Sequence, residues 1–197
     1  AQAPNVRTLL TLESLEYPIE LAEIAQPPLV LFCEGNLELL QNPKVAIVGT
    51  RHPSTQGIEN AHSFAKELAS SGLTVVSGLA AGIDRCAHEG ALLASNGAST
   101  IAVIGTGMDL VYPASNRELY RKIREQGLVI SEFPLGTPPT NNNFPRRNRI
   151  VVGLSRACLV IESAIDGGSM ISANFALEMG REVMAIPGSI HNPMARG

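Results

Sequence analysis

Short apolar runs recur along the chain, separated by stretches in which apolar residues return every three or four positions. Six of these runs are rich in β-branched residues, and their starts lie about 25–30 residues apart, the length of a strand–helix–strand unit. Most are continuously apolar rather than alternating, which is typical of strands covered on both faces in a parallel sheet. The predicted strands are Val45–Val48, Leu73–Val76, Thr100–Ile104, Leu128–Ile130, Cys158–Ile161 and Val183–Ile186.

Apolar residues at helical spacing predict helices between these strands. One series runs from Ile58 to Leu68 and stops at Gly72. Ser115 followed by Glu118 is a capping-box pattern, which predicts the start of another helix. Strand and helix therefore alternate, which predicts an α/β fold: a Rossmann-like, doubly wound, mostly parallel sheet with helices on both faces.

The residues before the first of these strands predict a lead-in to the sheet. Leu9 to Ala25 is interpreted as a short helical segment, and Leu29–Phe32 as an additional strand at the sheet edge. We therefore expect residues 1–43 to form a lead-in helix and edge strand, and residues 44–197 a Rossmann-like domain that carries the binding site. A chain of 197 residues suits one compact domain overall.

Composition narrows the class of protein. Apolar residues make up 45% of the chain and charged residues only 17%, with a net charge of −3. This charge argues against general electrostatic coating of nucleic acid, so any nucleic acid must bind at a local patch. Three scattered cysteines without metal-ligand spacing predict reduced thiols and no metal. No apolar run is long enough to span a bilayer and no secretion signal is visible, so we expect a cytoplasmic protein that no membrane holds.

Glycine-rich loops follow most of the predicted strands. In an open parallel sheet, ligands bind outside the carboxyl ends of the strands. Small residues there let a ligand approach the backbone and its N–H groups, an arrangement that suits phosphate. The alternative is that these glycines only make tight turns. The loops are Gly49–Arg51, Ser77–Asp84, Gly105–Gly107, Ser131–Pro134, Glu162–Ser169 and Pro187–Ser189.

A second feature is the segment Phe144–Arg149. Between Phe133 and Ile161 there are four arginines and no acidic residue. Arginine binds phosphate with fixed charge and paired hydrogen bonds, and an adjacent aromatic ring can stack on an unpaired base. This combination favours a single-stranded nucleic acid as ligand. The alternative is a solvated helix N-terminus with Phe144 in the core, although cations in a first helical turn oppose the helix dipole.

Catalytic patterns are weak by comparison. Asp84 and His88 are four residues apart and could form an acid/base pair, but a structural hydrogen bond is the favoured interpretation. The chain carries no nucleophile elbow, P-loop or zinc-binding helix pattern. We expect no catalytic residues.

The ordered motifs resemble the DNA-processing protein A (DprA/Smf) family of bacterial transformation over nearly the whole chain. They begin with the Tyr17-Pro18 lead-in and VGTR and end with the GGS and PGS loops. The motifs between them are SGLAAGID, GTGMDLVYP, SEFP and FPRRNRIVVGLS.

The resemblance implies a Rossmann-like domain that binds single-stranded DNA, protects it, forms homodimers and helps load the recombinase RecA in natural transformation. It implies no turnover and no cofactor. The DNA-binding positions that the motifs and the loops together indicate are Gly49, Thr50, Arg51, Phe144, Arg146, Arg147, Asn148, Arg149, Gly168 and Ser169.

The chain departs from the family's pattern in two respects, and two alternative functions remain open. Many relatives carry a lysine where this chain has Asn141–Asn143, so we expect a less positive pocket and weaker binding. Many relatives also have further domains at both ends, so we expect this chain to be the family's core. One alternative is a module that binds a small nucleotide in the same pocket. The other is a nucleotide hydrolase of the Lonely-Guy type, whose motif glutamate is missing when its glycines are aligned on Gly167 and Gly168.

Overall fold

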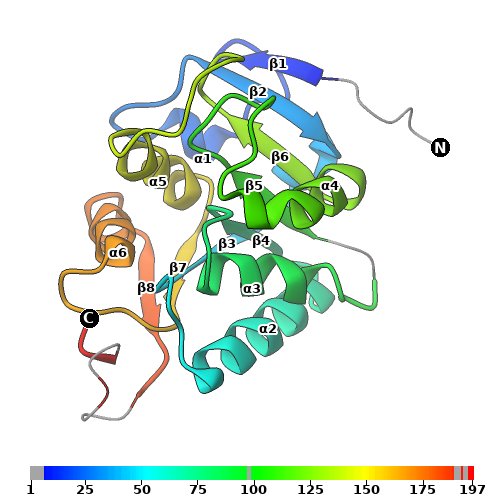
Figure 1. The fold of residues 1–197 in the computed structure, drawn as a ribbon. Coiled ribbons are helices and arrows are strands. Elements are labelled where there is room, and N and C mark those ends of the chain that lie inside the picture. The colour runs from blue at the N-terminus through cyan, green and yellow to red at the C-terminus, as the bar shows by residue number, and fades with distance from the viewer. Residues whose placement is uncertain (1–6, 97–98, 189–191, 193–194) are drawn as a thin grey trace.

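In the computed structural model, which describes residues 7–96, 99–188, 192 and 195–197, eight strands form one sheet (Figure 1). Their order across the sheet is β1-β2-β6-β5-β4-β3-β7-β8. The pairings β1–β2 and β2–β6 are antiparallel, and the remaining five are parallel, which confirms the predicted mostly parallel α/β sheet. The strands are β1 (Arg7–Thr11), β2 (Val30–Gly35), β3 (Lys44–Val48), β4 (Thr74–Ser77), β5 (Thr100–Val103), β6 (Leu128–Ser131), β7 (Ala157–Val160) and β8 (Glu182–Ala185).

Helices cover both faces of this sheet. In Figure 1, α2, α3 and α4 lie on one side, and α1, α5 and α6 lie on the other. The helices of the described residues are α1 (Ile19–Ala22), α2 (Thr55–Ser70), α3 (Ile83–Ala91), α4 (Arg117–Gln126), α5 (Asn143–Gly153) and α6 (Gly168–Glu178), with short 3₁₀ turns at Leu37–Leu40 and Ala114–Asn116.

Burial along β3 explains why the strands are apolar without alternation. Val45 and Ile47 join the cluster formed with α2 and α3, whereas Ala46 and Val48 join the cluster formed with α1, α5 and α6. Successive strand residues point to opposite faces, so a strand covered on both faces needs an apolar residue at every position. Each buried valine or isoleucine contributes about 1.5–3 kcal/mol from removing its surface from water.

The path of the chain creates a switch point beside β3. From β3 the chain proceeds outward through β4, β5 and β6, and then returns to add β7 and β8 on the other side of β3. The loops after β3 and β7 therefore leave the same sheet edge in opposite directions. A doubly wound sheet opens a ligand crevice at such a point.

The lead-in differs from the prediction. Residues 7–11 form a strand and not a helix, and α1 is only four residues long. Leu10 is buried against β2 while Leu9 is 54% exposed, so this segment follows the two-residue period of a half-covered strand. The predicted edge strand is also displaced, because β1 lies outside β2.

The predicted capping box at Ser115 is wrong as well. A 3₁₀ turn occupies Ala114–Asn116, so α4 begins at Arg117 and has no side-chain cap. Helix α4 ends at Gln126, immediately before Gly127.

The three cysteines are buried and form no disulfide. Within the described ranges, no helix combines the length and the hydropathy that a bilayer-spanning segment requires.

Candidate functional site

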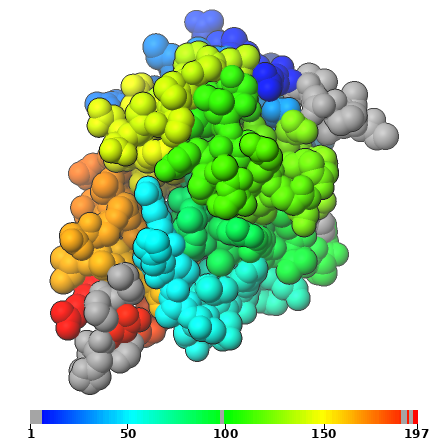
Figure 2. Space-filling view, in the orientation of Figure 1, coloured from blue at the N-terminus to red at the C-terminus, as the bar shows by residue number. Residues whose placement is uncertain are grey.

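A cleft of about 480 Å³ opens at the switch point, beyond the carboxyl ends of β3 and β4. Figure 2 shows the cyan residues near 50 between the orange residues of α6 and the green residues that follow β4. Eight of the ten predicted binding residues line this cleft: Gly49, Thr50, Arg51, Phe144, Arg147, Asn148, Gly168 and Ser169.

The loop after β3 is tied to the loop after β7. The Thr50 N–H donates to the Glu162 backbone carbonyl at 2.7 Å, and the Ser54 N–H donates to the Glu162 carboxylate at 2.9 Å. The Ser54 hydroxyl also donates to this carboxylate and accepts from the Gly57 N–H, so it caps α2. These contacts fix the backbone on either side of Arg51 and leave its side chain exposed.

Arg147 lies at the floor of the cleft and is only 4% exposed. Its guanidinium donates to the Val103 carbonyl and fills the space where a side chain on residue 78 would stand, which explains why that residue is Gly78. Burial lowers the pKa of Arg147 to about 10, with nearby Asp84 opposing the shift. Arg147 therefore remains a cation at neutral pH.

Asp84 supports the loop above this arginine. Its carboxylate accepts hydrogen bonds from the N–H groups of Gly78 at 3.1 Å and Ala80 at 3.4 Å. Burial raises the pKa of Asp84, while the Arg147 charge lowers it. His88 is occupied elsewhere, since its Nδ1 shares a hydrogen bond with the Thr100 hydroxyl at 2.7 Å. The two side chains thus have separate structural partners and do not form an acid/base pair.

An aromatic pair forms one wall of the cleft. The rings of Tyr112 and Phe144 are stacked, with centroids 5.3 Å apart and planes inclined by 27°. Gly105 allows this placement, because a Cβ there would lie 2.9 Å from the Phe144 ring. The Arg51 guanidinium sits 5.9 Å from the centroid of Phe144. A cation and a half-exposed aromatic surface therefore meet at one point.

The N-terminus of α6 forms the opposite wall. Gly167 is its N-cap residue and makes no side-chain cap, so the first N–H groups of an 11-residue helix face the cleft without a capping side chain. Ser169 donates from its hydroxyl to that of Ser163 at 2.7 Å and is buried, so it serves the loop's geometry. A bare helix N-terminus of this kind favours an anion.

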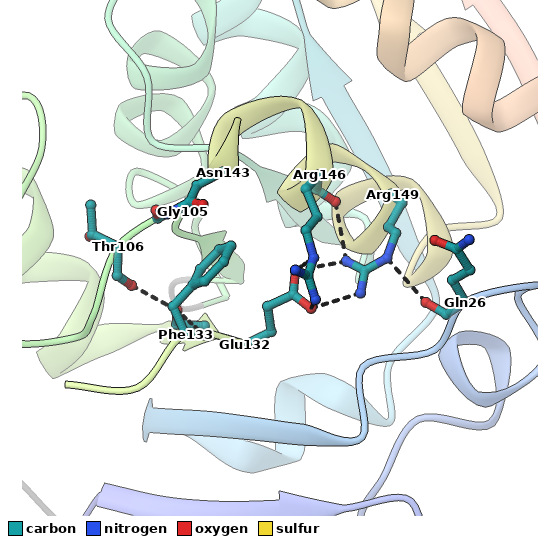
Figure 3. Close-up of polar contacts among 9 residues, drawn as sticks. Gln26, Gly105, Thr106, Glu132, Phe133, Asn143, Arg146 and Arg149 are labelled. Carbon is teal, nitrogen blue, oxygen red and sulfur yellow. Dashed lines mark hydrogen bonds and ion pairs between the residues drawn. The ribbon is translucent and has the colours of Figure 1, made fainter. Parts of the chain in front are cut away.

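Arg146 and Arg149 lie apart from the cleft. Arg149 binds the Glu132 carboxylate with two hydrogen bonds, at 2.9 and 2.7 Å, and donates from Nε to the Gln26 carbonyl at 3.0 Å. Arg146 contacts the same carboxylate at 3.2 Å and lies over the Phe133 ring. In Figure 3 both guanidinium groups turn toward Glu132. The Glu132 carboxylate thereby offsets one of the two positive charges of Arg146 and Arg149, and both side chains are held away from the cleft.

Sequence reasoning missed Tyr112 as a lining residue, although it lies in the GTGMDLVYP motif. It also placed too many glycine loops at one site. The loops after β3, β4 and β7 line the cleft, and Gly105 borders a smaller neighbouring cavity of about 170 Å³. Ser189, the last residue of another predicted loop, lies outside the described residues.

The fold and the site together define a class: a doubly wound α/β protein with a cationic, glycine-lined cleft at its switch point. Such clefts suit phosphate-bearing ligands.

The family model of DNA recombination-mediator protein A matches residues 8–197, so the chain belongs to that family. This confirms the resemblance that the motifs indicated. The chain is 47% identical over 184 residues to Protein Smf of Synechocystis, and the match covers 91% of this chain and 46% of that protein. It is also 47% identical to the DNA processing protein DprA of Streptococcus pneumoniae, covering 92% of this chain and 63% of that protein. The chain thus spans about half to two thirds of the length of these relatives.

Solved structures agree with this assignment. The crystal structure of DNA processing protein A from Streptococcus pneumoniae matches with a TM-score of 0.90 and 45% identity, covering 95% of this chain and 65% of that one. The protein of the same name from Helicobacter pylori, described for its single-stranded DNA binding mode, matches with a TM-score of 0.86 and 33% identity. That match covers 93% of this chain and 83% of that one.

Proposed function

We propose that the chain binds single-stranded DNA in the switch-point cleft and catalyses no reaction there. The observation that carries this proposal is the meeting of three features in one cleft. They are the exposed Arg51 side chain, the uncapped N-terminus of α6, and the stacked Tyr112–Phe144 pair.

Each feature has a distinct part in binding. Arg51 and the α6 N-terminus take successive phosphates, one by charge-assisted hydrogen bonds and the other by backbone N–H groups. The aromatic pair offers a face on which an unpaired base can stack. Bases in a duplex are already stacked on their neighbours, so this wall favours a single strand. Arg147 contributes positive charge from the floor and holds the shape of the Gly78 loop.

The comparisons support single-stranded DNA as the ligand. The Helicobacter pylori relative is described for its single-stranded DNA binding mode. Its structural match covers almost all of this chain. The family's description as a recombination mediator supports a proposal about the finer role. We propose that the chain protects incoming DNA and helps load RecA in natural transformation, acting as a homodimer in the cytoplasm.

A mononucleotide is the second candidate ligand. The cleft volume of about 480 Å³ falls within the range of small-molecule pockets, about 300–1,000 Å³. A phosphate, a sugar and a stacked base would satisfy the same features. The difference lies in whether additional nucleotides add affinity.

Fluorescence anisotropy with a labelled oligo-dT strand tests both candidates. Competitors are unlabelled duplex DNA and free mononucleotides, at several salt concentrations. The proposal expects the single strand to compete best and binding to weaken linearly on a log–log salt plot. Equal competition by a mononucleotide would favour the small-ligand alternative, and preference for duplex would overturn the proposal.

Two variants localise the binding to the cleft. Arg51→Ala should weaken binding, whereas Lys122→Ala, which removes an exposed cation on α4, should not. Equal losses in both would indicate general electrostatic attraction. Mass balance on a nucleotide substrate, followed over hours with the same protein, tests the absence of turnover.

A further inference from the structure

We propose that His62, Cys86 and Glu89 form a zinc-binding site on the face where α2 and α3 pack together. One ligand atom from each residue lies within 4.8 Å of the other two. His62 Nε2 and Glu89 Oε2 are 3.4 Å apart. This site is separate from the cleft, and the inference does not depend on the proposed function.

The three groups are the ligand types that zinc prefers. Zinc binds thiolate sulfur at about 2.3 Å and imidazole nitrogen or carboxylate oxygen at about 2.0–2.2 Å. In a tetrahedron with such bonds, neighbouring ligand atoms lie about 3.3–3.7 Å apart. The His62–Glu89 pair already has this spacing. Closing the remaining gap to sulfur needs a side-chain movement of about 1 Å.

Burial leaves room for a fourth ligand on one side only. The Cys86 side chain is buried, whereas those of His62 and Glu89 are 34% and 31% exposed. An ion would therefore be coordinated by the Cys86 sulfur on the protein side and by a water molecule on the solvent side. The Cys86 thiol proton leaves to solvent as the zinc–sulfur bond forms, so the ion binds a thiolate.

The backbone that holds these groups is closely packed. Gly90 lies against the backbone of His62, where a Cβ would collide with it. Ala61, Ala65 and Ala87 are fully buried nearby, so the two helices approach each other through small side chains. The positions of the ligand backbones are therefore set by the fold before any ion arrives.

Arg85 orients the carboxylate. Its Nε donates to Glu89 Oε1 at 2.8 Å, which leaves Oε2 directed at His62. Partners of this kind fix the orientation of metal ligands in known sites. Arg85 is thus a positioning residue and binds no ion itself.

A bound ion would join the two helices that carry the cleft loops. Helix α2 begins just after the loop that bears Arg51, and α3 begins at the end of the Gly78–Gly82 segment. Zinc bound by His62 of α2 and by Cys86 and Glu89 of α3 would link these two helices. The expected consequence is a rise in thermal stability on addition of zinc.

Cobalt serves as the spectroscopic probe. The metal-free 197-residue chain, kept reduced, is titrated with Co²⁺, and the near-ultraviolet absorption that arises from sulfur-to-cobalt charge transfer is followed. The proposal expects one ion per chain, the charge-transfer band, visible bands of a four-coordinate ion, and displacement by one equivalent of Zn²⁺.

Variants identify the ligands. Cys86→Ser should abolish the charge-transfer band, whereas Cys158→Ser, which alters another buried thiol, should keep it. His62→Gln changes a half-exposed side chain and should weaken Co²⁺ binding more than about tenfold, the loss that even an outer partner of a ligand can cause. If Cys86→Ser fails to fold, as judged by circular dichroism, His62→Gln decides alone.

Two results would overturn the site. One is the absence of any charge-transfer band at saturating Co²⁺ in the unmodified chain. The other is a charge-transfer band that persists in Cys86→Ser, or Co²⁺ binding that keeps its full affinity in His62→Gln. In either case the sulfur or the imidazole ligand would lie elsewhere.

Discussion

Replacing Arg149 by alanine separates a structural role from a DNA-binding role. Sequence reasoning assigned Arg149 to DNA, but its guanidinium is held by Glu132 and the Gln26 carbonyl. The side chains of Arg149 and Glu132 are 8% and 5% exposed, so the pair is buried. Removing one partner of a buried ion pair typically costs about 3–5 kcal/mol, because the other charge stays buried.

The magnitude can be narrowed from the neighbouring contact. Arg146 also reaches the Glu132 carboxylate, at 3.2 Å, and still offsets part of its charge in the variant. We therefore expect a loss near 3 kcal/mol, at the lower end of the range. For a chain of this size, each kcal/mol shifts the melting temperature by about 2–4 °C, so the fall should be roughly 6–12 °C.

Thermal and urea unfolding followed by circular dichroism measure this loss. Arg146→Ala is the matched control, since its side chain is 63% exposed and contacts the same carboxylate, and it should cost less than about 1 kcal/mol. Oligonucleotide binding, measured well below both melting temperatures, should keep its salt slope in Arg149→Ala. An unchanged melting temperature together with a shallower salt slope would refute this reasoning and make Arg149 a phosphate ligand.

Three further predictions concern Arg51, the aromatic pair of the cleft, and the buried His88. Arg51→Ala should reduce the slope of log affinity against log salt by about 1 with little change in melting temperature, and an unchanged slope in anisotropy titrations would contradict its role. Phe144→Ala should weaken oligonucleotide binding by about 1–3 kcal/mol, as should Tyr112→Ala; loss of stability without loss of binding would instead assign these rings to the core. Burial lowers the pKa of His88 from 6.5 to about 3, so the unfolded chain binds a proton in this interval that the folded chain does not. The free energy of unfolding therefore keeps its full value above pH 6.5 and decreases as the pH falls toward 3. In His88→Gln, the free energy of unfolding measured in urea should depend less on pH over this interval. An unchanged dependence on pH would mean that His88 titrates normally.

The central sheet could be predicted because its signal is local. Strands buried on both faces, such as β3 and β5, are written as continuous apolar runs, and the glycines that follow them mark the ligand edge. The lead-in could not be predicted, because β1 forms a strand through its pairing with β2 and not through its own sequence pattern. Leu10 faces Leu31 in that pairing, and nothing in residues 9–25 distinguishes this from a helical repeat.

The candidate site was predictable only in part for a similar reason. Residues 133–161 are positively charged, but Glu132, one position before them, binds both Arg146 and Arg149 across the fold and offsets one of their two charges. Tyr112 reaches Phe144 from a distant loop. Side-chain partners so far apart in sequence are fixed by the tertiary fold.

Glu162 has a mechanical consequence for binding. Its backbone and carboxylate hold the Thr50–Ser54 loop from across the switch point, so the loops after β3 and β7 form one rigid unit. A ligand that enters finds its phosphate-binding groups already in place and orders little of the protein, which removes much of the entropic cost of association. The free and occupied forms should therefore superimpose closely at these loops, and affinity should respond to changes at Glu162 even though this side chain need not touch the ligand.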